Sequence, residues 1–122
     1  MRRMILSSIT LLVFLSIADS LNGNPASRIT DIQQCPLFCE QGTERIPHAG
    51  GPISTGIQTV LICGLPAARV GDIATCQCGA PPTIVSGSQT VLIGGQPAAR
   101  VGSTTSHGGT VVMGCNSVDI GG

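Results

Sequence analysis

Apolar and polar positions follow the same order in three parts of the chain, at residues 52–72, 82–103 and 110–122. In each part an apolar run reaches a glycine, and a second run follows in which apolar and polar residues alternate. Alternation with a period of two, rich in β-branched residues, predicts short strands, and the short break between the runs predicts a hairpin. The corresponding positions are Gly56, Gly87 and Gly114, then Val60, Val91 and Val118, then Ile62, Ile93 and Ile120.

A phrase follows the second run: "GLPAARVGD" at residues 64–72 returns as "GQPAARVGS" at residues 95–103. Such recurrence indicates one structural unit used more than once. The prolines need no ladder hydrogen bond after the glycine, and the alanines are small enough for chains to cross closely. We expect the arginines to be structural, bound to turn carbonyls or nearby acids. The motif residues are Pro66, Ala67, Ala68 and Arg69 in the first copy and Pro97, Ala98, Ala99 and Arg100 in the second.

Hairpins of this size cannot bury an apolar face alone, so the three units must pack against one another. A compact body around an approximate threefold axis is the simplest way to close three units. The pattern therefore predicts a small all-β domain of short hairpins over residues 24–122, with pseudo-threefold symmetry.

Residues 1–23 have a different pattern and form an apolar leader. Arg2 and Arg3 are followed by an almost uninterrupted apolar run from residue 4 to residue 18, and then by small residues. This order is typical of a secretory signal peptide, and a membrane anchor or a misassigned translation start would give the same pattern. The leader is left out of the predicted fold under all three interpretations.

The composition of the chain limits the classes of partner and of stabilising link that we expect. The chain has six Arg, no Lys and six acidic residues, so its formal net charge is zero. A nucleic-acid-binding protein usually has a basic excess, and we therefore expect no nucleic-acid partner. With two Phe and no Trp or Tyr, the core has no large rings. A disulfide or a metal ion would stabilise so small a domain.

Cysteine and histidine residues follow the repeat. At an offset of four residues lie the pairs Asp31 and Cys35, Asp72 and Cys76, and Ser103 and His107. Side chains at equivalent points of three units converge around a threefold axis, and His48 precedes its hairpin much as His107 does. Two thiolates and two imidazoles form a complete tetrahedral set for a structural Zn²⁺ ion, with no open position for a catalytic water. The predicted ligands are Cys35, His48, Cys76 and His107, with Cys78 as an alternative to Cys76.

The cysteines also allow a second interpretation. Their number is even, so a secreted chain held together by disulfides is the alternative to the metal site. In the metal interpretation Cys63 and Cys115 are small apolar residues within hairpins. An enzyme is not expected, because neither G-x-S-x-G nor H-E-x-x-H occurs and both histidines are better used as ligands.

The two PAAR phrases, each between a strand-like run and "VG", resemble the PAAR-repeat family. The similarity runs through nearly all of residues 25–122, in "DIQQCP", "PHAGGPI", "GIQTVLICGLPAARVGD", "GSQTVLIGGQPAARVGS" and "HGGTVVMG". The resemblance implies a small cone-shaped β domain that binds zinc near its apex. Carried over to this sequence, the zinc ligands would be Cys35, His48, Cys76 and His107.

For function, the resemblance implies a structural protein at the tip of a type VI secretion system. It would cap the trimeric valine-glycine-repeat (VgrG-type) spike with one tip per trimer, sharpen it for membrane puncture and adapt effectors for delivery. The expected partners are the spike, a separate effector chain and, transiently, the target membrane. The expected location is the bacterial cytoplasm, followed by delivery outside the cell or into a target cell, while the leader leaves export or inner-membrane anchoring open. A contractile phage tail-spike tip and a secreted disulfide-stapled β protein are the alternatives.

Overall fold

The computed structural model describes residues 4–5, 23–77 and 79–122. The leader expected at residues 1–23 therefore lies outside the described residues apart from positions 4, 5 and 23, and so does Cys78. The described part of the chain contains no helix long and apolar enough to cross a membrane. Its regular secondary structure consists of strands, which confirms the all-β prediction.

Twelve short strands form five small sheets among the described residues. The strands are β1 (Met4–Ile5), β2 (Asn24–Ala26), β3 (Ile32–Gln34), β4 (Phe38–Gln41), β5 (Glu44–Pro47), β6 (Gly51–Pro52), β7 (Ile57–Ile62), β8 (Leu65–Ala67), β9 (Val91–Ile93), β10 (Gln96–Pro97), β11 (Thr110–Val111) and β12 (Cys115–Ile120). β9 lies between β1 and β10 in one sheet, and β3 lies between β11 and β6 in another. The remaining sheets are the pairs β12–β2, β4–β5 and β7–β8.

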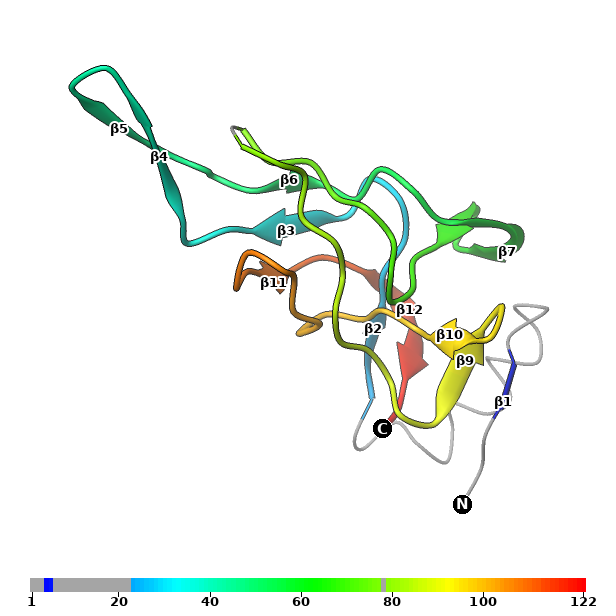
Figure 1. Ribbon diagram of the computed structural model, residues 1–122. Coiled ribbons are helices and arrows are strands. Elements are labelled where there is room, and N and C mark those ends of the chain that lie inside the picture. Colours follow the sequence, from blue (N-terminus) through cyan, green and yellow to red (C-terminus); the bar gives the residue numbers. More distant parts are fainter. Residues whose placement is uncertain (1–3, 6–22, 78) are drawn as a thin grey trace.

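Three equivalent units make up the body (Figure 1). The hairpins β7–β8 and β9–β10 belong to the first and second units, but each turns after the second apolar run and not at Gly56 or Gly87, where the sequence pattern predicted the break. The turns lie at residues 63–64 and 94–95, where both residues have a positive φ, as a two-residue hairpin turn requires. The third unit joins distant parts of the sequence, because β12 pairs antiparallel with β2 and places Ile120 opposite Asn24 and Cys115 opposite Ala26. β2 thus takes the role of β8 and β10. Residues 25–28, "PASR", are therefore a third copy of the PAAR phrase, which the sequence analysis missed.

A ring of three backbone hydrogen bonds marks the approximate threefold axis. The amide of Ser27 donates to the carbonyl of Ala99 (3.0 Å), the amide of Ala99 to Ala68 (3.0 Å), and the amide of Ala68 back to Ser27 (2.9 Å). The three residues belong to three different units, and all are fully buried. Their small side chains allow three chain segments to meet at the axis. The predicted pseudo-threefold symmetry is confirmed.

Two clusters of aliphatic side chains form the core. The first contains Ala26, Val60, Ile62, Ala67, Val91, Ile93, Ala98, Cys115, Val118 and Ile120, and the second contains Ile53, Ala68, Ala74, Ile84, Ala99 and Val111. Neither cluster, among the residues described, includes an aromatic ring. Apolar burial is correspondingly modest, which leaves much of the stability to other links between the units.

The glycine that begins each hairpin is explained by a close approach between strands. A Cβ built at the glycine would lie 2.8 Å from the carbonyl oxygen of Ala67 for Gly56, 2.5 Å from that of Ala98 for Gly87, and 2.7 Å from that of Ala26 for Gly114. Real side chains do not come this close to backbone oxygen. The same residue type therefore recurs in all three units for the same steric reason.

One hairpin projects from the body (Figure 1). Its strands β4 and β5 pair with each other, and the guanidinium of Arg45 lies 4.5 Å from the ring centre of Phe38. We call residues 36–47 the arm. The arm lies between two predicted ligands, Cys35 and His48, and the repeat pattern did not predict it because it has no counterpart in the other units.

The prediction that Cys63 and Cys115 are small apolar residues is wrong, because they form a disulfide. Cys63 is exposed in the turn between β7 and β8, whereas Cys115 is buried at the start of β12. Their Cα atoms are 6.3 Å apart although 52 residues separate them in sequence. The disulfide joins the first unit to the third, so the fold combines a covalent link with a Cys and His cluster.

Candidate metal centre

The arm brings the first two candidate ligands together. Cys35 directly follows β3, and His48 directly follows β5. The amide of His48 donates to the carbonyl of Leu37 (2.9 Å), which closes the base of the arm. As a result the Sγ of Cys35 and the Nδ1 of His48 come within 3.4 Å, although the two residues are 13 positions apart.

Cys76 lies on a loop that is fixed on both sides. On one side the amide of Thr75 donates to the carbonyl of Pro52 (2.8 Å), which ties the loop to β6. On the other side the amide of Gln77 donates to the carbonyl of His48 (3.1 Å). These bonds place the Sγ of Cys76 2.9 Å from the Nδ1 of His48.

A tight turn presents His107. The amide of Thr105 donates to the carbonyl of Gly109 (3.0 Å), and the amide of Gly108 donates to the carbonyl of Thr105 (2.9 Å). The amide of Gly109 also donates to the hydroxyl of Thr105 (3.1 Å). Both ends of the turn are buried, so the imidazole between them has a defined direction.

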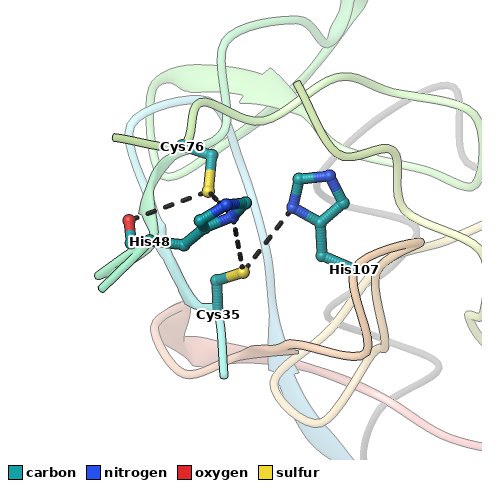
Figure 2. A group of neighbouring side chains, drawn as sticks. All are labelled: Cys35, His48, Cys76 and His107. Carbon is teal, nitrogen blue, oxygen red and sulfur yellow. Dashed lines mark hydrogen bonds between the residues drawn. The ribbon is translucent and has the colours of Figure 1, made fainter. Parts of the chain in front are cut away.

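The four side chains converge (Figure 2), and their candidate ligand atoms all lie within 4.8 Å of one another. The Sγ of Cys35 is 3.6 Å from the Nδ1 of His107, in addition to its contact with His48. The centres of the two imidazole rings are 5.1 Å apart, and the rings are inclined at 59°. His48 is 6% exposed, and the other three residues are partly buried.

This donor set fits a tetrahedral metal ion. Zn–S bonds of about 2.3 Å and Zn–N bonds of about 2.0–2.1 Å, at tetrahedral angles, separate a sulfur from a nitrogen ligand by roughly 3.6 Å. The Sγ of Cys35 lies 3.4 and 3.6 Å from the two imidazole nitrogens. Thiolate and imidazole ligands together suit Zn²⁺. Four protein ligands leave no coordination position for a substrate, which is typical of a structural site.

The other predicted motif residues lie in the body rather than among these ligands. Pro66 and Ala67 lie on β8, Pro97 lies on β10 with Ala98 directly after it, and Ala68 and Ala99 belong to the ring. Arg69 and Arg100 donate from their guanidinium groups to backbone carbonyls of a neighbouring unit. The PAAR phrase therefore joins the units, while the residues after it supply the ligands.

The polar residue at the end of each phrase caps a turn. The amide of Arg28 donates to Oδ2 of Asp31 (2.8 Å), that of Arg69 to Oδ2 of Asp72 (2.9 Å), and that of Arg100 to Oγ of Ser103 (3.0 Å). Asp and Ser side chains are favoured in such turns because they accept from the nearby backbone. Ser103 thus replaces the aspartate of the other copies without loss of the bond.

Gln33 is a residue of the centre that the repeats did not reveal, because its counterparts in the other units are not glutamine. Its side chain is fully buried, and its Nε2 donates to the carbonyl of Thr75 (3.0 Å). Gln33 lies two positions before Cys35, and Thr75 directly precedes Cys76, so this bond fixes one thiol relative to the other. Its Oε1 is buried with no hydrogen-bond partner among the described residues.

We expect Gln33→Met to weaken binding of Co²⁺ or Zn²⁺ by the full chain about tenfold, as loss of an outer hydrogen bond does at other metal sites. Methionine has a similar volume but cannot donate to Thr75. Titration with Co²⁺, followed by its thiolate absorption bands, measures the affinity. Gln34→Ala, at the exposed neighbouring position, is the matched control and should bind like the wild type. Equal affinities for all three proteins would show that Thr75 is positioned without this bond.

Comparison with known families agrees with this geometry. The sequence profile described as PAAR motif matches residues 43–113, which is more than half of the 122-residue chain. The matched region includes the two PAAR phrases and three of the four candidate ligands, His48, Cys76 and His107. No match was found among the curated proteins. On the extent of the family match, the chain belongs to the PAAR-motif family.

Proposed function

We propose that the chain is a structural tip protein, which caps a trimeric valine-glycine-repeat (VgrG-type) spike of a type VI secretion system with one tip per trimer. The observation that carries the proposal is the ring of hydrogen bonds between Ser27, Ala68 and Ala99. It gives a single chain an approximate threefold axis, and such a chain presents three similar surfaces to a threefold partner. Membership in the PAAR-motif family supports the same role.

The end of the body that carries the hairpins is the proposed docking surface. In Figure 1 the hairpins β7–β8 and β9–β10 lie at the end away from the arm. Leu61 on β7 is 44% exposed, whereas its neighbours Val60 and Ile62 are buried in the core. An exposed leucine on a short edge strand is suited to contact with another β structure.

The metal centre and the arm would form the opposite, leading end. Zinc held by the two cysteines and two histidines would stabilise this end without a large core, because metal-binding energy becomes folding energy. We propose that this end meets the target membrane, that the tip assembles on the spike in the bacterial cytoplasm before delivery, and that effectors are carried as separate chains.

A structural rather than a catalytic role is part of the proposal. A hollow of about 200 Å³ lies beside the metal centre, lined by Gln34, Cys35, Pro36, Gly108, Gly109 and Thr110. This lining contributes no carboxylate or histidine that would act as a general base beside a substrate. The Cys and His residues are better explained as metal ligands.

One observation favours the alternative of a secreted, disulfide-stapled β protein, namely the disulfide between Cys63 and Cys115. The two functions differ in what holds the fold together. A chelator added without a reductant would unfold a zinc-dependent tip, whereas a reductant added without a chelator would unfold the disulfide-stapled protein.

The test of the cap role is light scattering of the full chain mixed with the trimeric spike protein from the same genome. We expect the mass of one tip plus three spike chains. Leu61→Arg should weaken the complex at least about tenfold, because it places an unpaired charge in the contact. Arg45→Ala, on the arm, is the control and should bind like the wild type. No complex at micromolar concentration, with folded and metal-loaded protein, would remove this partner. Equal binding by both variants would move the docking surface elsewhere.

A further inference from the structure

Three seams join the units around the ring, and the backbone is alike at each. The amide of Val70 donates to Pro97 (2.9 Å) between the first and second units, that of Val101 to Pro25 (2.9 Å) between the second and third, and that of Ile29 to Pro66 (3.0 Å) between the third and first. We call the last of these the closing seam. Differences between the seams therefore come from side chains.

At each of the other two seams an arginine side chain donates hydrogen bonds to the neighbouring unit, and we call this contact an arginine latch. Nη1 of Arg69 in the first unit donates to the carbonyls of Ile93 (3.3 Å) and Gly94 (2.9 Å) in the second. Nη1 of Arg100 in the second unit donates to the carbonyl of Ile120 (3.0 Å) in the third. Hydrogen bonds from a charged donor are stronger than those between neutral groups, so each arginine holds the end of the neighbouring strand.

At the closing seam the equivalent arginine is bound within its own unit. Nε of Arg28 donates to Oδ2 of Asp31 (3.0 Å), and Nη2 donates to Oδ1 (2.9 Å). The hydrogen bond to Asp31 raises the pKa of the Arg28 guanidinium above its usual value. In the repeat, Ile62 and Cys63 are equivalent to Ile93 and Gly94, the residues that accept from Arg69. Their carbonyls are therefore the acceptors that an Arg28 latch would use.

A side chain at position 63 explains the difference. Its counterpart in the second unit is Gly94, where an added Cβ would collide with the Nη1 of Arg69. Cys63 therefore has a side chain at the point that a latching Arg28 would need to reach. That side chain forms the disulfide with Cys115 of the third unit, across the same seam.

We propose that Cys63 and Cys115 are a reversible redox site that locks the closing seam in place of an arginine latch. A low-molecular-weight disulfide, such as oxidised glutathione, accepts two electrons and two protons from the two thiols. The S–S bond between the cysteines forms, the S–S bond of the oxidant breaks, and two reduced thiol molecules leave. The reverse reaction starts when a thiolate attacks one sulfur and forms a mixed disulfide.

The surroundings of the pair suit this exchange. Cys63 is exposed, which gives a small thiol access to its sulfur. The hydroxyl of Ser117 lies 3.4 Å from the Sγ of Cys63 and 3.1 Å from the Sγ of Cys115, and is placed to donate to either thiolate as it forms. The Cα distance of 6.3 Å is within the range that disulfides span.

The redox state of Cys63 and Cys115 depends on the cellular compartment. Thiols stay reduced in the bacterial cytoplasm and are oxidised outside it, so the closing seam would be open where the chain is made and locked where it arrives. Cys115 is the first residue of β12, which pairs with β2, so we expect the disulfide to act above all on the third unit. The redox site rests on the ring and the disulfide and holds with or without a spike partner, whereas its change between compartments rests on the proposed function.

Equilibration of the zinc-loaded full chain in glutathione buffers of graded composition tests the redox site. Alkylation read peptide by peptide is required, because Cys39 is also disulfide-bonded. We expect Cys63 and Cys115 to become reactive together, in a single transition, while the fold is retained. Reactivity of only one of them, or of neither until the chain unfolds, would overturn the proposal.

Hydrogen exchange of backbone amides tests the lock. The matched variant Cys63→Gly with Cys115→Ser carries the residues found at the equivalent positions Gly94 and Ser88, so the other units show that both types fit. We expect amides of β12 and β2 to exchange at least about tenfold faster in this variant than in the oxidised wild type. Amides of β9 should be unchanged, and the reduced wild type should match the variant. Equal acceleration in all units, or none, would overturn the lock.

Discussion

The His48→Ala chain is expected to be unfolded at room temperature. A structural zinc centre contributes on the order of 10 kcal/mol in small domains, and whole domains are stable by about 5–15 kcal/mol. The Nδ1 of His48 lies 3.4 Å from the sulfur of Cys35 and 2.9 Å from that of Cys76, so its loss opens the middle of the donor set. Far-UV circular dichroism during heating, with one equivalent of zinc, measures the effect. Trp and Tyr fluorescence offers no signal, because the chain has neither residue.

Two controls isolate the metal. Gln34→Ala changes an exposed side chain beside Cys35 and should melt like the wild type. A chelator added to the wild type without a reductant should reproduce the unfolding. The disulfide between Cys63 and Cys115 stays intact in this experiment, so the effect comes from loss of the metal. A cooperative melt of His48→Ala close to that of Gln34→Ala would contradict a structural metal centre.

The Gly50→Ala chain is expected to lose at least about 3 kcal/mol of stability, from a strained backbone and a steric collision together. Gly50 has a φ of 72°, and an added Cβ would collide with the carbonyl oxygen of Gln33 and lie 2.9 Å from the Cα of Gln34. Both neighbours belong to β3, which is hydrogen-bonded on both sides and has little freedom to move. Urea unfolding followed by circular dichroism gives the free energy of unfolding.

Gly64→Ala is the matched control for the backbone alone. Gly64 has a φ of 82° with nothing within 4 Å of an added Cβ, so it should lose only about 1–2 kcal/mol. Equal losses in the two variants would show that β3 moves aside for the new methyl group. Gly50 also lies two residues after His48, so the collision should weaken metal binding in Gly50→Ala and not in Gly64→Ala.

Features that recur at a fixed spacing could be predicted from the sequence. The strands β7 and β9 and the equivalence of the first two units follow from apolar alternation and the repeated phrase, although the hairpin turns lie one run later than predicted. The convergence of Cys35, Cys76 and His107 follows from their equal offsets after three equivalent turns. Three-way symmetry turns equal sequence offsets into spatial proximity, which is why a short chain was enough to suggest the centre.

Features that occur once could not be predicted in this way. The third PAAR-like copy was missed because β2 and β12 are at opposite ends of the described body and share one unit. The pairing of Cys63 with Cys115 depends on the geometry of the closing seam, and nothing near either cysteine in sequence indicates it. Gln33 matters because it reaches Thr75 in another unit, and this contact has no counterpart at the other two positions.

The pairing of β12 with β2 also sets the order in which a ribosome can complete the fold. β2 precedes the other strands of the ring and β12 follows them, so among the described strands β2 waits for its partner until the other two units have been made. The ligand set is complete earlier, as soon as His107 has left the exit tunnel. A metal ion held by these four residues would therefore bind while the ring is still open. Entry of β12, which pairs with a strand far away in sequence, would then be the slow final step in closing the ring.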